Sequence, residues 1–209
     1  DYLDAGDNKI PSASEKLEKY WETCGTTNNS WGYKSYDNDW KSPKELLYYF
    51  VDILSKGGNY LLNIGPDGKG NVPETSAQNL RKMGKWIHLN AEAVYGTSRW
   101  KIPNEGQEET LLDGTGHRAT KGFKRNFTSK DFWFTTKGNK VYVISLSNTE
   151  GDVLIKSLRK GEENIEEVKL LGSDKILIWD QNKDGLKTTV IGVPKNALGY
   201  VIEVTLKNK

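Results

Sequence analysis

Polar and apolar positions follow two different periods along the chain, and the change of period divides it in two. The letters SPKE at residues 42–45 have the form of a helix N-terminus, with Ser42 as the N-cap and Pro43 at the first helical position. Apolar residues then recur between residues 47 and 54 at the spacing of one helix face, and a glycine pair at 57–58 follows. This pattern predicts a helix that begins at Pro43 and ends at the glycines.

A short apolar run, NYLLNIG at residues 59–65, comes next, between a glycine and a proline. Its length and flanks predict a strand buried on both faces, as in a parallel sheet. A second helix is predicted from Pro73 to about residue 94, because apolar residues again keep the helical period. Loop, helix, strand, loop and helix in this order are typical of a (β/α) barrel. We therefore expect residues 1–98 to form the C-terminal part of a (β/α)8 TIM-like barrel.

From about residue 99 the period changes to that of strands. Short apolar runs such as DFWFTT, VYVISLS, LKTTVIG and YVIEVTL are separated by turn residues, among them KGN, NTEGD and KDG. The segment TTKGNKVYVIS has the form of a hairpin. Several strands at this regular spacing, with no helical pattern between them, predict an antiparallel β-sandwich over residues 99–209. The expected fold is thus α/β in the first part and all-β in the second.

Composition narrows the classes of partner. The chain has 209 residues, a formal net charge of +2 and 35% hydrophobic residues, with basic and acidic residues interspersed. The one basic cluster, KGFKRNFTSK, is interrupted by phenylalanines, so no nucleic-acid partner is expected. The longest apolar runs are too short to cross a bilayer, so no membrane partner is expected. With one cysteine, Cys24, and two histidines, neither an internal disulfide nor a zinc site is expected, and we expect no cofactor or metal.

Aromatic residues gather in one polar stretch, KYWETCGTTNNSWGYKSYDNDW at residues 19–40. The stretch lies just before the first predicted helix, and ligands of a parallel barrel bind in such loops at the carboxyl ends of the strands. Aromatic rings pack on the apolar faces of sugars, whose hydroxyl groups need carboxylates and amides. Two interpretations are open: Trp21, Trp31 and Trp40 plug the barrel end, or they line a sugar site. The glutamate and asparagines between them favour a sugar site.

Hydrolysis of a glycosidic bond requires two carboxyl groups that flank the bond. One acts as an acid and the other as a nucleophile or base. Composition does not select among the carboxyl groups of the first part, most of which should be solvated surface charges. The candidates are Asp1, Asp4, Asp7, Glu15, Glu18, Glu22, Asp37 and Asp39.

Three longer motifs are more specific. The segments YWETCGTTNNSWGY, SPKELLYYFVDILSKGGNYLLNIGPDGKGNVPE and KMGKWIHLNAEAVYGT resemble, in this order and spacing, the later barrel region of glycoside hydrolase family 29, the α-L-fucosidases. The likeness covers residues 1–100 almost continuously, and residues 100–209 are similar to the family's C-terminal β-sandwich by pattern. The resemblance implies a retaining mechanism without a metal, in which an Asp nucleophile forms a covalent fucosyl-enzyme and a second carboxyl group serves as acid and then base.

The family's nucleophile lies in a short aromatic–Asp motif on an earlier barrel strand, and we do not find that motif in these 209 residues. The resemblance therefore implies that the nucleophile is upstream of this chain. We expect the chain to be the C-terminal portion of the enzyme, inactive alone, with the N-terminal part of the same enzyme as its partner.

The acid/base residue is carried over with one ambiguity. Many family members have a segment similar to Asp-Tyr-x-Thr-Pro-Glu, followed by Ile-Pro, and its Glu is the acid/base. Here the letters are DYLDAGDNKIP. Aligned from Asp1-Tyr2, the position falls on Gly6, which has no acid; aligned back from Ile10-Pro11 with one insertion, it falls on Asp7. We choose Asp7 as catalytic acid/base and Glu22, a Glu common to the family, as second choice.

Substrate contacts also follow from the resemblance. Trp31 matches the aromatic position of the family's S-[WF]-G-Y motif, whose ring packs against the fucose methyl group. Asn63, at the end of the predicted strand, is expected to satisfy loop backbone near the pocket. The implied activity is that of a retaining exo-α-L-fucosidase acting on terminal fucose of oligosaccharides or glycoprotein glycans. A catalytically inactive, lectin-like homologue that binds fucose remains the alternative.

Two further expectations concern the sandwich and the compartment. A separate carbohydrate-binding module in the sandwich would need exposed rings on one sheet face. Because Trp133 and Trp179 alternate with apolar neighbours, we expect them to pack in a core instead. The substrate class favours a secreted or periplasmic protein, or a lysosomal one in a eukaryote.

Overall fold

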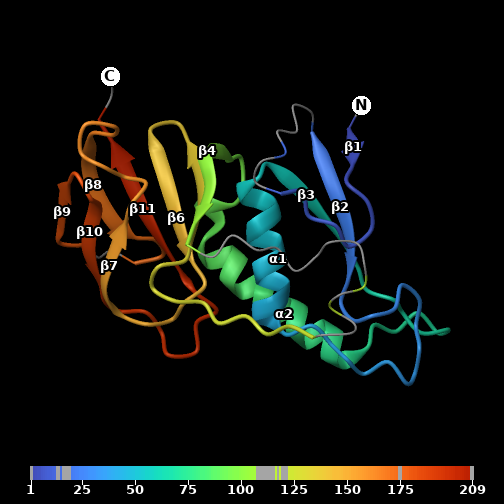
Figure 1. Ribbon diagram of the computed structural model, residues 1–209. Helices are drawn as coiled ribbons and strands as arrows, with labels where there is room; N and C mark the ends of the chain where they lie inside the picture. Colours follow the sequence, from blue (N-terminus) through green and yellow to red (C-terminus); the bar gives the residue numbers. More distant parts are fainter. Residues whose placement is uncertain are drawn as a thin grey trace. The chain divides into compact units, whose positions relative to one another are not determined.

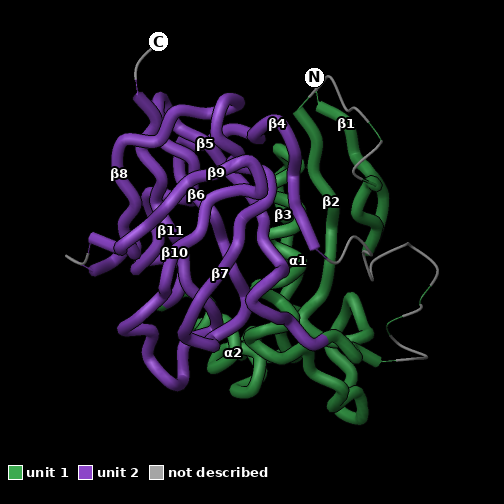
Figure 2. Tube along the Cα trace, turned by 60° about the vertical axis from the view of Figure 1, so that its left-hand side comes forward, with its two compact units in different colours: residues 1–85, 109–125 green, residues 86–108, 126–209 purple. Residues whose placement is uncertain are grey.

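The computed structural model describes residues 2–12, 15, 20–106, 116, 118, 122–173 and 176–207. The chain divides into two compact units (Figure 2). Unit 1 comprises Asp1–Lys85 and Glu109–Arg125, and unit 2 comprises Trp86–Glu108 and Asn126–Lys209. Each unit is built around its own sheets (Figure 1).

Unit 1 contains a three-stranded parallel sheet in the order β1-β2-β3. Its strands are β1 (Leu3–Asp4), β2 (Trp21–Thr26) and β3 (Gly58–Asn63), and its helices are α1 (Pro43–Ser55) and α2 (Glu74–Leu89), the end of which belongs to unit 2. Helix α1 connects β2 to β3 and packs against β3, so these elements form a β–α–β unit. The predicted succession of helix, strand and helix is confirmed.

Helix α1 begins where the sequence predicts. The hydroxyl oxygen of Ser42 accepts a hydrogen bond from the backbone N–H of Glu45 at 3.1 Å, and Pro43 occupies the first turn. The helix ends at Ser55, and Gly57 follows with a φ of +77°. Burial extends further around the helix than one predicted stripe: Leu46, Leu47, Tyr48, Tyr49, Val51 and Ile53 are all buried.

The prediction that β3 is buried on both faces is wrong. Exposure alternates along the strand, and the side chain of Leu61 is 56% exposed. Helix α1 covers one face of the sheet in unit 1, where Trp21 is buried, while the other face is open. The sequence pattern shows only that a strand is apolar, because a leucine on an uncovered face has the same letter as a leucine in a core.

Unit 2 consists mainly of two antiparallel sheets, as the predicted sandwich requires. The five-stranded sheet has the order β4-β5-β6-β11-β8, with β4 (Ser98–Glu105), β5 (Phe132–Lys137), β6 (Lys140–Ser145), β11 (Tyr200–Leu206) and β8 (Ile165–Leu170). The three-stranded sheet has the order β7-β10-β9, with β7 (Gly151–Ile155), β10 (Gly185–Val190) and β9 (Trp179–Asn182).

The predicted hairpin is confirmed as β5–β6, in which Lys137 pairs with Lys140 and Gly138 has a φ of +59°. Alternate residues of both sheets meet in one hydrophobic core, which includes Phe132, Phe134, Val143, Ile155, Leu186 and Ile202. The opposite face of the five-stranded sheet is also occupied, since the hydroxyl of Thr135 donates to the carbonyl of Ala93 in the short helix η1 (Ala91–Ala93).

Candidate active site

Strand register places polar side chains in rows on the open face of the parallel sheet. Asp4 of β1 lies beside Glu22 of β2, and Glu22 lies beside Asn59 of β3. One step toward the carboxyl end, Cys24 lies beside Leu61. Because side chains alternate between the two faces of a strand, these residues share the face that Trp21 does not occupy. Two carboxyl groups from adjacent strands therefore stand side by side on this face.

The charges of three carboxylates reach the thiol of Cys24. Burial is the largest cause that raises the pKa of this thiol, and the negative charges of Asp4, Glu22 and Asp7 follow. Glu22 also acts on Tyr2: its charge and its hydrogen bond with the phenol are the main causes that raise the pKa of Tyr2. The charges of Asp4, Asp7 and Glu22 thus all act on Cys24, and we call these four residues the acidic face.

Asp7 reaches the acidic face through a docked segment of backbone. The N–H groups of Leu3 and Ala5 donate to the carbonyls of Tyr20 and Glu22 at 2.8 and 2.9 Å, and that of Asn8 donates to Cys24 at 2.7 Å. Asp7 lies in the turn at the end of this segment, with an exposed side chain. The structure therefore places both acid/base candidates, Asp7 and Glu22, on neighbouring parts of one sheet.

Gly6, the other alignment position, has a backbone reason to be glycine. Its φ is +98°, in the left-handed region that side chains disfavour. Its carbonyl accepts from the hydroxyl of Thr23 at 2.8 Å, and its N–H donates to the carboxylate of Asp4 at 2.8 Å. Gly6 fixes the turn that presents Asp7.

The loop that carries Trp31 is anchored at the carboxyl end of β3. The side-chain amide of Asn63 donates to the carbonyl of Trp31 at 2.6 Å, as the sequence predicts for an asparagine that satisfies loop backbone. Gly65, with a φ of +52°, leaves little room for a side chain, because a Cβ there would lie 3.2 Å from the same carbonyl. Trp31 is therefore held by its backbone, while its side chain stays 42% exposed.

The tryptophans of the aromatic stretch have different environments. Trp21 is only 2% exposed, and its indole N–H donates to the carbonyl of Lys56 at 3.3 Å. It belongs to the covered face of the sheet, so including it in a sugar site is wrong. Trp40 is half-buried, whereas Trp31, Tyr33 and Tyr36 are exposed. Three exposed aromatic rings of the stretch thus lie on the loop after β2, and a fourth, that of Tyr20, lies just before β2.

An ionic network that is buried at Arg118 and Glu45 and exposed at Asp39 anchors this loop, and no sequence pattern indicates it. The guanidinium of Arg118 contacts the carboxylates of Glu45 and Asp39, at 2.8 and 2.6 Å. A hydrogen bond from Asn29 is the main cause that lowers the pKa of Asp39; burial opposes the shift, and the charge of Arg118 adds to it. Lys41, 2% exposed, lies beside the network, and burial lowers its pKa to about 8.

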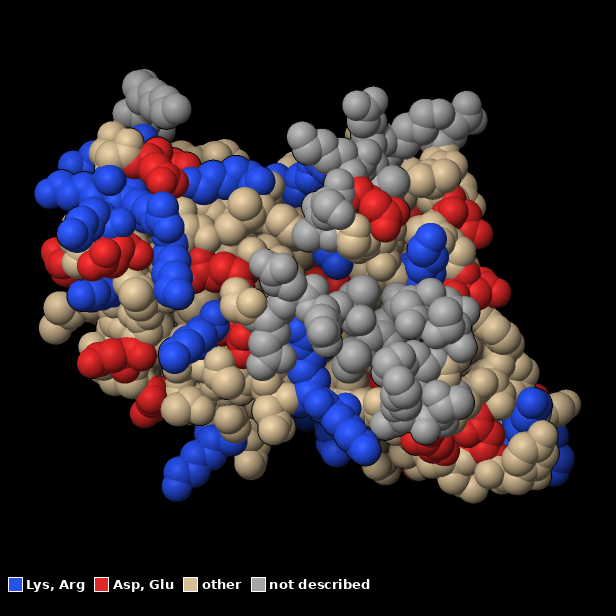
Figure 3. Space-filling model, viewed as in Figure 1, with Lys and Arg blue, Asp and Glu red and all other residues tan. Residues whose placement is uncertain are grey.

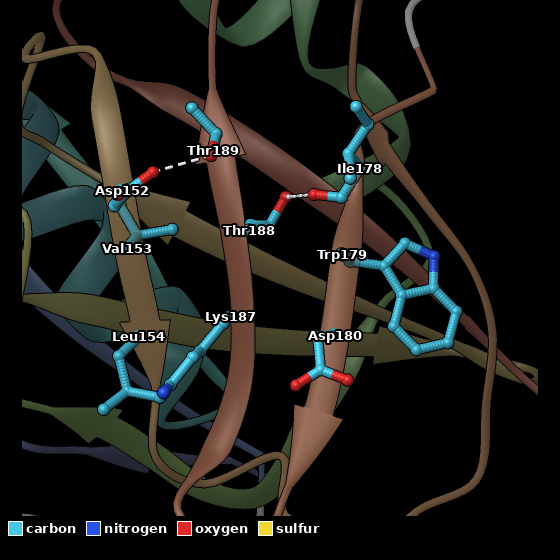
Figure 4. A pocket seen from close by; sticks show the side chains of 9 residues that line it. All are labelled: Asp152, Val153, Leu154, Ile178, Trp179, Asp180, Lys187, Thr188 and Thr189. Carbon is cyan, nitrogen blue, oxygen red and sulfur yellow. Dashed lines mark hydrogen bonds between the residues drawn. The ribbon is translucent and has the colours of Figure 1, made fainter.

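Unit 2 has an open groove on its three-stranded sheet, with a volume of about 440 Å³ (Figure 4). Lys187 of β10 lies between Leu154 of β7 and Asp180 of β9, and Ile178 nearby is 90% exposed. Trp179 is partly buried and packs against the sandwich core, and Trp133 is buried at 1% exposure. Core packing of Trp133 is confirmed, and the indole of Trp179 is shared between core and groove rim.

Three further features concern the surface charge, the metal ligands and the helices of the described residues. On the face shown in Figure 3, basic and acidic side chains of the described residues are interspersed. Within the described ranges, no group of three or more histidine, cysteine or acidic side chains is arranged to hold a metal ion. Among the same residues, no helix is both long enough and apolar enough to cross a membrane.

The family profiles and two sequence relatives that match this chain are all described as alpha-L-fucosidases. The family profile described as Alpha-L-fucosidase matches residues 2–92, and the profile described as Alpha-L-fucosidase C-terminal domain matches residues 124–207. The plasma alpha-L-fucosidase of Rattus norvegicus is 32% identical over 172 residues, which are 80% of this chain and 33% of that protein. The human tissue alpha-L-fucosidase is 30% identical over 192 residues, 90% of this chain and 36% of that protein.

Solved structures agree with the sequence relatives. Alpha-L-fucosidase isoenzyme 1 from Paenibacillus thiaminolyticus has a TM-score of 0.75 and 25% identity, covering 100% of this chain and 45% of that one. The Thermotoga maritima alpha-fucosidase in complex with fucose has a TM-score of 0.70 and 26% identity, covering 90% and 41%. The chain spans about a third of the length of the plasma and tissue relatives. The chain belongs to the α-L-fucosidase family, of which it represents the C-terminal part.

Proposed function

We propose that this chain is the C-terminal part of a retaining exo-α-L-fucosidase, which hydrolyses terminal α-L-fucose from oligosaccharides or glycoprotein glycans. One observation carries the proposal: Asp4 and Glu22 of the acidic face lie side by side on the open side of the parallel sheet, and Asp7 lies in the turn that follows β1. The exposed ring of Trp31 stands on a loop at the carboxyl end of that sheet. Carboxyl groups near an aromatic ring suit hydrolysis of a sugar.

The same arrangement suits a barrel. In a (β/α)8 barrel the helices cover the outside, the opposite face is the interior, and ligands bind at the carboxyl ends of the strands. We therefore assign residues 1–98 to the barrel, with the acidic face inside, and residues 99–209 to the sandwich. The order β1-β2-β3 leaves an outer edge on β1 and on β3. These edges are the places at which strands of the N-terminal part would pair.

The roles of the residues follow from the chemistry of retention. The nucleophilic Asp belongs to the N-terminal part and attacks the anomeric carbon of fucose. Asp7 donates a proton to the leaving oxygen and then removes one from the attacking water; Glu22 is the second candidate for this role. The two carboxyl groups of a retaining enzyme stand about 5–5.5 Å apart. Trp31 packs against the fucose methyl group, and no cofactor or metal takes part.

The test is the activity of the complete enzyme on an aryl α-L-fucoside, with the anomer of the first product followed by NMR. Retention predicts that α-L-fucose appears first and that the β anomer follows by mutarotation. If β-L-fucose appears first, the mechanism inverts. If the enzyme binds fucose but releases none, the catalytically inactive, lectin-like alternative holds. Glu74→Ala, an exposed carboxylate of α2, is the matched control and should leave the rate unchanged.

Partners and compartment follow from the substrate. The partners we propose are a fucosylated glycan and the N-terminal part of the same enzyme, without nucleic acid or membrane. Such glycans occur outside the cytoplasm, which favours a secreted, periplasmic or lysosomal protein. Measuring activity in separated culture medium and cell fractions tests this placement.

A further inference from the structure

Arg118 lies far along the sequence from the helix and the loop of unit 1 that it contacts. Its side chain is 8% exposed. The guanidinium Nε and Nη2 donate to the two carboxylate oxygens of Glu45 in α1, at 2.8 and 3.2 Å. Its Nη1 donates to the side-chain carbonyl of Asn29 at 2.9 Å and to the carboxylate of Asp39 at 2.6 Å. One guanidinium thus holds a helix on one side and the loop after β2 on the other.

The residues that Arg118 holds are the two ends of the loop that carries Trp31. Asn29 lies two positions before Trp31, and Asp39 lies near the end of the loop. The side chain of Asn29 also donates to the carboxylate of Asp39 at 2.7 Å, so the two ends are linked to each other. The carboxylate of Asp37 accepts from the N–H of Asn29 at 3.2 Å and from the hydroxyl of Ser30 at 2.5 Å. The loop is therefore closed on itself around these contacts.

Glu45, the partner of Arg118 in α1, is held in place by a further contact within the helix. The carboxylate of Glu45 is 3% exposed and also accepts a hydrogen bond from the hydroxyl of Tyr49 at 2.9 Å. A bidentate contact between a guanidinium and a carboxylate is directional and strong for an ion pair. Arg118 therefore ties the loop to a side chain whose own position is set by α1.

We propose that Arg118 is a positioning residue for fucose binding: it fixes the loop of residues 27–41 to α1 and so holds Trp31 where it contacts the sugar. This inference rests on the proposed function and on the role proposed for Trp31 in it. Arg118 itself does not need to touch the substrate. Without it, Asn29 and Asp39 keep their contact with each other but lose their attachment to Glu45.

The kinetic test uses Arg118→Ala in the complete enzyme, with an aryl fucoside as substrate. A loosened Trp31 weakens binding of the substrate and of the transition state alike, so KM should rise about tenfold, the effect of one apolar contact, while kcat changes little. A merely structural role would instead lower the amount of active enzyme, and thus the apparent kcat, with KM unchanged. Trp31→Ala should give the same rise in KM, and in the double variant the two effects should not add.

A second measurement reads the loop without any activity. Lys34 is exposed and lies in the loop, so limited digestion by trypsin after Lys34, followed by mass spectrometry, reports how often the loop opens. Cleavage should be faster in Arg118→Ala than in the wild type. Arg81→Ala is the matched control, because Arg81 is a 68% exposed arginine of α2 paired with Glu74, and it should leave both cleavage and KM unchanged.

A second variant distinguishes unfolding of the protein from loss of the contact that Arg118 makes between the loop and Glu45. Arg118→Ala leaves the buried carboxylate of Glu45 without its cation, which by itself destabilises the protein. Arg118→Ala combined with Glu45→Gln removes that buried charge, so the melting temperature should recover while KM stays high and Lys34 stays sensitive. In Arg118→Lys the charge remains, but the pair of N–H donors that binds both oxygens of Glu45 is lost, so an intermediate KM is expected.

The outcomes separate this inference from the proposed function. Unchanged cleavage at Lys34 in Arg118→Ala overturns the inference, whatever the kinetics. Faster cleavage with wild-type KM also overturns it, because the loop then moves without consequence for binding. If the wild-type enzyme does not hydrolyse fucosides, the proposed function fails, and this inference, which rests on it, fails with it; cleavage at Lys34 then still shows whether Arg118 holds the loop.

Discussion

The pKa of Lys41 shows how strongly burial acts on a single ionisable residue of unit 1. Its side chain is nearly inaccessible at 2% exposure, and its ammonium group donates to the carbonyl and, at 3.3 Å, to the hydroxyl of Thr26. The ring of Tyr49 lies 5.8 Å from the same ammonium group. Removal from water disfavours the charged form, and the charge of Glu45 opposes this, so that the pKa falls from 10.5 to about 8.

This lowered pKa predicts a dependence of stability on pH. Between pH 8 and about 10.5 the unfolded chain binds the proton of Lys41 more than the folded one does, so stability should rise with pH, by up to about 3 kcal/mol over the whole window. Burial raises the pKa of Tyr49 and Tyr60, which opposes this gain above about pH 10. Melting temperatures between about pH 8 and 9.5 therefore avoid most of the contribution of these tyrosines, and a variant at Lys41 is needed to isolate its own contribution.

The comparison is between the wild type, Lys41→Met and Lys34→Met. The Lys41→Met variant should lose part of the rise in melting temperature with pH, whereas Lys34→Met, a change on the exposed loop, should keep all of it. Lys44, whose pKa burial also lowers to about 8, contributes equally to all three proteins and cancels. An identical slope in Lys41→Met and the wild type would show that Lys41 is not desolvated in the folded state.

Residues of the site differ in how far the sequence could reveal them. Trp31 stands in a recognisable motif, and the structure shows it exposed on the expected loop. Asp7 and Glu22 were selected by alignment alone, and their roles stay predictions. Arg118 could not be found, because it contacts Glu45 and Asp39 across 73 and 79 positions of the chain and no local period relates such residues. A long-range ionic contact leaves no local pattern in a single sequence.

At the scale of elements, two glycines allow the strands of the parallel sheet to bury large rings. The ring of Tyr60 occupies the space that a Cβ on Gly25 would need. The indole of Trp21 does the same at Gly58. Both glycines lie on the covered face, because Gly25 has the same parity as Trp21 in β2 and Gly58 pairs with Trp21. The packing of β2 on β3 thus requires small residues beside large ones.

Substitution of Gly25 by alanine should therefore destabilise the fold. The added methyl group would overlap the ring of Tyr60, which is half-buried with an inaccessible hydroxyl, so a loss of about 1–3 kcal/mol is expected. Urea denaturation of the complete enzyme measures the loss. Gly68→Ala is the control, because no atom lies within 4 Å of its added Cβ, and it should change the midpoint little. Equal midpoints for both variants would contradict this packing.

Elements with strong local signals were predicted well. The SPKE start of α1 and the KGN turn of β5–β6 act through hydrogen bonds and φ angles within a few residues, so the sequence determines them locally. The burial of β3 was predicted wrongly, because it depends on which faces neighbouring elements cover. Local chemistry sets where an element begins and ends, while tertiary contacts decide which of its faces are buried.

At the scale of the whole molecule, family membership and fold agree. A parallel β–α–β unit and an antiparallel sandwich follow one another, and both match parts of known α-L-fucosidases. The described residues of unit 1 show a parallel β–α–β arrangement, and the assignment of this unit to a (β/α)8 barrel stays a proposal. The same holds for the nucleophile, whose proposed position lies in the N-terminal part. In the proposed function, the acidic face is the feature of this chain that links fold to catalysis.

The most direct test of that link compares the complete wild-type enzyme with Asp7→Ala and Glu22→Ala, on an aryl fucoside and on a natural fucosylated glycan, with and without azide. An activated aryl group leaves without a proton, whereas the glycan needs one, and azide can replace the water that a base would activate. We predict that Asp7→Ala keeps most activity on the aryl fucoside, loses it on the glycan and is rescued by azide. The same pattern in Glu22→Ala would move the role to Glu22, and near wild-type rates in both variants would contradict catalysis by the acidic face.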